Sequence, residues 1–281
     1  MAWAGSLTLD YRCDTVHGAL RTVLHDRHDG PLRVLASLYP EARAVCHNVL
    51  VHPPGGLVGG DALRIDLNLA EGTHALVTTP GATRYYRSTG AAATQHVHAT
   101  LGAGARLEWL PLETIAYSGC IGASTVGFEL APGAEMIGWD LLALGLPASK
   151  QAFERGRFEQ RIEWPGRWLE RGVIDAEDRR LLDSPLGWAG HRALGTLWFA
   201  AGTPLAAARL DTLLDAARGV IGADAALRAT SGVSAPGDGL IALRVLAPRV
   251  EPAMRLLVAV WSAWREAAWQ MAPCVPRVWR T

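Results

Sequence analysis

Three turns of similar sequence divide the strand-like part of the chain: LAEGT at residues 69–73, LGAGA at 101–105 and LAPGA at 130–134. Their glycines recur at intervals of 32 residues (72 to 104) and 29 residues (104 to 133). LRIDLNL, at residues 63–69, alternates apolar and polar side chains as a half-buried strand does. A repeat of this length is typical of stacked β-hairpins or β-coils, each covering the apolar face of its neighbour. A favoured hairpin turn that recurs independently explains the same segments.

Helical patterns appear only late in the chain. Residues 203–219 offer Thr203 as N-cap, Pro204 at the first helical position and Gly219 as the C-terminal stop. A short strand is expected at 240–246, and a second helix from Pro252.

We therefore expect a mainly β fold, an elongated stack of β-sheets or β-coil-like sandwich, with two helices towards the C-terminus. No linker rich in Pro, Gly or Ser divides the sequence, so residues 1–281 are predicted to form a single domain. This domain would be β-rich over 1–200 and helix-containing over 203–270.

Charge and composition exclude several classes of function. Lysine and arginine total 27, as do aspartate and glutamate, so no basic excess favours nucleic acid or an anionic membrane. The N-terminus lacks the pattern of a signal peptide, and the apolar stretch 254–269 is too short and too charged to span a bilayer. Four cysteines stand far apart, without a C-x-x-C pair. We expect a cytoplasmic protein that binds neither nucleic acid nor membrane.

The second helix carries Trp261 and Trp264 on one apolar face. Two interpretations are open for this face. It packs on the chain's own sheet, or it binds a partner, since tryptophan is enriched where interfaces concentrate binding energy.

The segment HPPGGLVGGD, at residues 52–61, is a candidate site of a different kind. A phosphate-binding loop runs into a helix N-terminus, whereas this one runs into a strand and lacks the P-loop lysine. Two prolines fix the backbone and four glycines permit tight folding, so the loop would hold His52 and Asp61 in defined positions. A metal site or a structural corner remain the two alternatives.

Other polar residues do not combine into a catalytic motif. His96 and His98 share one face of a strand, as two metal ligands or as a polar surface. Glu113 has no partner carboxylate at a spacing that suggests an acid–base pair. Asp140 lies among apolar residues, where an unpaired carboxylate is costly. We expect no enzymatic activity.

Five segments together resemble the family of urease accessory protein UreD, called UreH in some species: HPPGGLVGGD, TTPGATRYYRSTG, LEWLPLETIAYSGC, IGWDLLALGLPAS and PRVWRT. The resemblance runs from about Tyr11 to Thr281. It implies an accessory protein without turnover, an elongated β-stack with two helices. It also implies binding to the helical accessory protein UreF, to the GTPase UreG through UreF, and to apo-urease, in a homodimer of heterotrimers.

The resemblance further implies that nickel reaches urease through an internal, water-filled passage. No cofactor would be bound tightly, and Ni²⁺ would be held only transiently. Such a path needs carboxylates, imidazoles and water as weak ligands. We expect Asp61 and Asp140 to line it, with His52, Glu41 and Glu113 as secondary candidates.

Two other functions are compatible with the same residues. A metal-dependent β-sandwich hydrolase would use His52, Asp61 and His96. A purely structural binding module would use none of the internal carboxylates.

Overall fold

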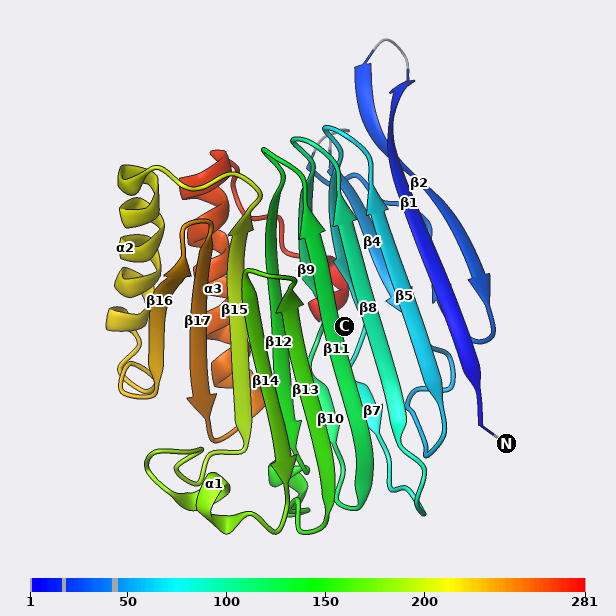
Figure 1. Cartoon of the computed structure of the whole chain (residues 1–281), viewed down its shortest axis with the longest axis vertical. Coiled ribbons are helices and arrows are strands. Elements are labelled where there is room, and N and C mark those ends of the chain that lie inside the picture. Colours follow the sequence, from blue (N-terminus) through cyan, green and yellow to red (C-terminus); the bar gives the residue numbers. More distant parts are fainter. Residues whose placement is uncertain (1, 17–18, 42–44, 281) are drawn as a thin grey trace.

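The chain passes back and forth several times between two facing sheets, as Figure 1 shows. The computed structural model describes residues 2–16, 19–41 and 45–280, so the predicted domain limits at 1 and 281 lie outside the described residues. The seven-stranded sheet has the order β14 (Trp168–Asp175), β13 (Gly156–Trp164), β11 (Cys120–Leu130), β8 (Ala93–Leu101), β5 (Ala62–Leu69), β1 (Ala4–Val16) and β2 (Ala19–Asp29).

The second sheet has ten strands. Its main order is β16 (Ser231–Gly237), β17 (Leu240–Ala247), β15 (Ala193–Ala201), β12 (Glu135–Leu144), β9 (Arg106–Leu110), β6 (His74–Thr78), β4 (Val45–Val51) and β3 (Arg33–Val34). Two short strands complete it, β10 (Thr114–Ala116) beside β12 and β7 (Thr83–Tyr85) beside β10.

The three similar turns each carry the chain from the first sheet to the second. They join β5 to β6, β8 to β9 and β11 to β12, and their glycines have φ of +70° at Gly72, +63° at Gly104 and +76° at Gly133. Positive φ is the conformation for which glycine is the favoured residue. Successive coils pair in parallel, and β5, β8 and β11 end in register at these turns. The stacked β-coils predicted from the repeat are therefore confirmed.

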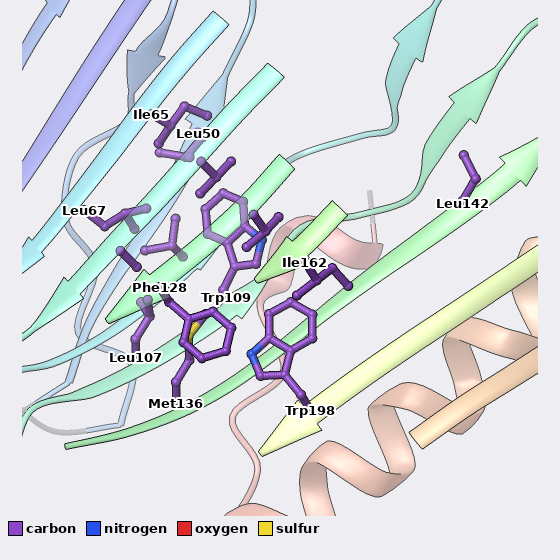
Figure 2. Packing of buried hydrophobic residues seen from close by; sticks show 14 of the residues in the cluster. Leu50, Ile65, Leu67, Leu107, Trp109, Phe128, Met136, Leu142, Ile162 and Trp198 are labelled. Atoms are coloured by element: carbon purple, nitrogen blue, oxygen red, sulfur yellow. The ribbon is translucent and has the colours of Figure 1, made fainter. Parts of the chain in front are cut away.

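Alternating burial in β1, β5, β8, β11 and β13 places one face of the first sheet in the space between the sheets. β5 follows the predicted pattern, with Leu63, Ile65, Leu67 and Leu69 buried. Figure 2 shows the resulting core, in which Phe128 stacks on Trp198 with ring centroids 5.9 Å apart. Strands of a parallel sheet are buried on both faces when a layer covers each face of the sheet. In the second sheet, every residue of β12 is buried in this way.

The helices follow the strands of the coils. α2 (Ala207–Ala223) and α3 (Val250–Trp269) pack together, and α3 covers the outer face of the ten-stranded sheet, where a second apolar cluster forms (Figure 1). A short helix, α1 (Arg179–Asp183), and the 3₁₀ turns η1 (Pro147–Ser149) and η2 (Arg277–Arg280) were not expected from the sequence. In the described part of the chain, none of the helices has the length and apolar character that a membrane span requires.

The predicted limits of the first late helix are wrong. Thr203 is not its N-cap, because Thr203 Oγ1 accepts a hydrogen bond from the amide of Gly133 and Leu205 N bonds to Asp238 O. These contacts keep the segment extended, so Ala206 becomes the N-cap. The helix also runs through Gly219 to Ala223.

The other late elements agree more closely with the sequence. β17 covers the predicted strand at 240–246. α3 begins two residues before Pro252, which then lies in the first turn, where a helix tolerates proline.

Candidate functional site

The glycine loop before β5 forms a corner closed by Asp61. Its carboxylate accepts hydrogen bonds from the backbone amides of Trp3 (2.8 Å) and Val58 (2.9 Å), and the residue is only 4% exposed. Gly55 and Gly60 adopt φ of +78° and +93°. Asp61 thus uses both oxygens to fasten the corner to the N-terminal strand, the bonding expected of a structural acid.

His52, at the other end of this loop, lines an open pocket of about 220 Å³. Burial lowers the pKa of His52, and the negative charge of Asp61 partly opposes that shift. The imidazole is therefore neutral near pH 7, the form that can donate a lone pair to a metal ion. Thr83 and Gln95 line the same pocket.

Asp140 lies on β12 with its side chain between the two sheets, and it is 8% exposed. Burial raises the pKa of this carboxyl to about 6, while Gln160 acts in the opposite direction. Two buried polar atoms near Asp140 have no hydrogen-bond partner among the described residues: Gln160 Nε2 and Thr196 Oγ1. Thr196 lies opposite Asp140, on the neighbouring strand β15. The pKa of Tyr85 is raised mainly by burial and, to a smaller extent, by the negative charge of Asp140. The apolar core thus contains a polar patch.

A small cavity of about 20 Å³ adjoins Asp140. That volume suits about one water molecule. Thr83 and Gln95 line both this cavity and the pocket of His52, and Leu112 lines both this cavity and a third space of about 480 Å³. Glu113 lines that third space. His52, Asp140 and Glu113 therefore each border one of three neighbouring spaces in a row, which share lining residues.

Glu41 belongs to a different group, between β4 and the C-terminal segment. Its Oε1 lies 2.6 Å from His47 Nε2, and its Oε2 accepts a 2.6 Å hydrogen bond from Arg265 Nη2. Burial alone would raise the pKa of Glu41, but the bonds from His47 and Arg265 outweigh burial and hold that pKa below its ordinary value. Cys274 completes the group, and its pKa is raised by burial and then by the charge of Glu41.

The fully buried Arg265 continues this network to Glu108 on β9. Its Nε lies 3.2 Å from Glu108 Oε2 without the alignment of a hydrogen bond. Both carboxylate oxygens of Glu108 have other partners. His74 Nε2 lies 2.8 Å from Oε1, and Trp261 Nε1 donates a 2.6 Å hydrogen bond to Oε2. The guanidinium is thus enclosed by two carboxylates inside the protein.

The two tryptophans proposed as a partner-binding face are both 0% exposed. Trp261 bonds to Glu108, and Trp264 Nε1 donates to Leu213 O of α2. Of the two interpretations left open, the structure shows the first, a helix packed on its own sheet. Neither indole is offered to a partner.

The residues of the hydrolase alternative are not brought together. His96 is exposed on the outer face of β8, and Asp61 is committed to backbone amides. Within residues 2–16, 19–41 and 45–280, one group of three has ligand atoms within 4.8 Å of one another: Glu41, His47 and Cys274. His47 and Cys274 were missed by the sequence analysis, because no motif spacing links positions so far apart.

Comparison with known proteins gives a consistent result over the whole chain. The family described as UreD urease accessory protein matches residues 4–280. The chain is 62% identical to a urease accessory protein UreD of Leptothrix cholodnii over 281 residues, all of both chains. It is 57% identical to proteins of the same name from Variovorax paradoxus, over all of both chains, and from Paracidovorax citrulli, over 99% of each.

Proposed function

Because the chain belongs to the UreD family of urease accessory proteins, we propose that it helps to assemble the metal centre of urease. In this proposal it is a non-catalytic chaperone in the cytoplasm. It binds apo-urease together with UreF and, through UreF, the GTPase UreG, as a homodimer of heterotrimers, and it facilitates the insertion of nickel.

The observation that carries this proposal is the extent of the match. Relatives named urease accessory protein UreD align with this chain from end to end at 62% and 57% identity. Identity at that level over the full length implies a shared fold, so we propose a similar set of partners.

We further propose that nickel passes through the row of three spaces described above. The row is bordered in turn by a neutral imidazole, His52, by the buried carboxyl of Asp140, and by the carboxylate of Glu113. Oxygen and nitrogen ligands presented singly suit a borderline ion that binds briefly and is released. The cavity at Asp140 is the smallest of the three, so Asp140 is the residue on which transit would depend most.

Asp61 has a different place in this proposal from the one the resemblance implies. Its two backbone bonds favour a role in holding the corner beside His52. The same observation favours a second candidate function, a purely structural binding module whose internal acids serve the fold alone.

The test is a urease operon from which this gene has been deleted, complemented with the wild type or a variant. Three quantities are measured: urease activity, nickel per urease active site, and co-purification of the accessory complex. Normal urease activity in the deletion strain at ordinary nickel levels would refute the accessory role.

For the passage, Asp140→Ala should lower the nickel content of urease while the complex still assembles. Asp211→Asn, at an exposed position of α2, is the matched control. Unchanged nickel loading with Asp140→Ala, His52→Ala and Glu113→Gln would exclude the passage and leave the structural module.

A further inference from the structure

Three side chains capable of binding a metal meet where the C-terminal segment crosses β4. A carboxylate oxygen of Glu41, a ring nitrogen of His47 and the sulfur of Cys274 all lie within 4.8 Å of one another. We infer that these three residues form a binding site for a divalent transition-metal ion. The site lies apart from His52, Asp140 and Glu113, and it rests on its own geometry rather than on the proposed function.

The backbone around each ligand is held by contacts that do not involve a metal. Leu38 and His47 exchange two backbone hydrogen bonds of 2.9 Å, which place the segment leading to Glu41 against β4. Arg265 Nη1 donates to Ala272 O at 2.8 Å, which fixes the segment that carries Cys274. The three ligands are thus brought together by the fold and do not depend on an ion to meet.

Arg265 orients the carboxylate of Glu41 for this purpose. Arg265 Nη2 donates a hydrogen bond to Glu41 Oε2, so the other oxygen, Oε1, faces His47 Nε2 at 2.6 Å. An ion bound to both atoms would replace this hydrogen bond with two coordination bonds, for which the two atoms must move further apart than 2.6 Å. A buried group that hydrogen-bonds the outer oxygen of a ligating carboxylate is the usual second layer of a metal site.

The kinds of ligand define the kind of ion. One oxygen, one imidazole nitrogen and one thiolate suit Zn²⁺, Ni²⁺ or Co²⁺, and they disfavour Mg²⁺ and Ca²⁺, which require oxygen ligands. Three protein ligands leave a position for water or for a group from another molecule. The thiol proton leaves to solvent when the sulfur binds, so the complex carries a thiolate.

Access to the site is from the side of the cysteine. His47 and Glu41 have side chains 6% and 12% exposed, and Cys274 is partly exposed. An ion can therefore reach the sulfur first and then the two deeper ligands.

The first experiment titrates the purified, metal-free full chain with Co²⁺ and, separately, Ni²⁺. A thiolate-to-metal charge-transfer band should appear in the near ultraviolet and saturate at one equivalent. Cys274→Ser should abolish this band, and Cys13→Ser, at an exposed cysteine of β1, should leave it unchanged. A band that persists in Cys274→Ser, or no band in the wild type, would overturn the inference.

A second measurement uses the unaltered chain, so that no variant has to fold. Alkylation of Cys274 by iodoacetamide is followed by mass spectrometry with and without Co²⁺, and Cys13 serves as the internal reference. Cobalt should slow the modification of Cys274 alone. Equal rates with and without the ion would contradict the site. Asp140→Asn should leave both readouts unchanged, so this test and that of the nickel passage can fail separately.

Discussion

Arg265 Nη2 donates a 2.6 Å hydrogen bond to Glu41 Oε2, which joins two residues 224 positions apart in the sequence. The guanidinium is 0% exposed, and the carboxylate of Glu108 lies on its other side, with Oε2 3.2 Å from Nε. The last long helix is therefore joined by charge to the segment before β4 and to β9 of the second sheet.

Replacing Arg265 with methionine should strongly destabilise the protein. The change keeps much of the side-chain volume but leaves the carboxylates of Glu41 and Glu108 without their shared counter-ion. Removing one partner of a buried ion pair costs about 3–5 kcal/mol. Urea denaturation followed by circular dichroism measures this loss. Arg255→Met, at an exposed position of the same helix, is the control and should change stability by about 0.5 kcal/mol or less.

Asp140→Asn should change how stability depends on pH. Because burial raises the folded-state pKa from 3.8 to about 6, the carboxyl favours folding fully below pH 3.8. That contribution is lost as the pH rises through 6, where folding forces the acid to stay protonated or be buried charged. The loss for the wild type is on the order of 3 kcal/mol. The variant lacks this loss, so its stability relative to the wild type should rise between pH 4 and pH 7.

Thermal unfolding of both proteins across that pH range measures the difference. Asp211→Asn, at an exposed position, should show no such trend. If Asp140→Asn and the wild type keep a constant difference from pH 4 to pH 7, the carboxyl is not buried as the structure has it.

Asp61→Ala should destabilise the corner before β5. The substitution removes the acceptor of two backbone amides, those of Trp3 and Val58, at a cost of about 1–3 kcal/mol. Hydrogen exchange should show faster exchange of these two amides in particular. Asp66→Ala, which removes a surface ion pair with Arg64, should cost about 1 kcal/mol or less. Unchanged exchange at Trp3 and Val58 would show that Asp61 does not hold the loop.

Gly138→Ala should destabilise the core between the sheets. A Cβ at this position would lie 2.3 Å from Cζ2 of Trp198, far inside van der Waals contact. Overpacking of this kind costs about 1–3 kcal/mol. Gly232→Ala, where nothing lies within 4 Å, is the matched control in a strand of the same sheet. Adding Trp198→Phe to the Gly138→Ala variant should recover part of the lost stability. If the free-energy changes of the two single substitutions simply add in the double variant, the contact between the two positions is contradicted.

The coils could be predicted from the sequence because their signals are local. The alternation in β5, the recurring turn glycines and the apolar surroundings of Asp140 all report on neighbours within a few residues. The start of α2 could not be predicted, since the hydrogen bond from Gly133 to Thr203 crosses 70 positions and overrides the local preference for a cap.

The candidate sites differ in the same way, in whether local sequence signals could identify them. His52, Asp140 and Glu113 were identified from residue type, local context and family resemblance, and each lies beside one of three neighbouring spaces. The group of Glu41, His47 and Cys274 was not, because the fold brings its third member from the far end of the chain. Asp61 was expected to be held in place by its loop and to line the nickel path, but sequence alone could not reveal that its oxygens accept hydrogen bonds from backbone amides.

The bond between Glu41 and Arg265 also has a consequence for synthesis. Ribosomes release Glu41 and Glu108 well before Arg265, so the nascent coils carry two acids whose counter-charge has not yet been made. Domains of this size commonly pass through partly folded intermediates. The outer face of the second sheet, which α3 covers, therefore cannot be closed by that helix until residues 250–269 have been synthesised.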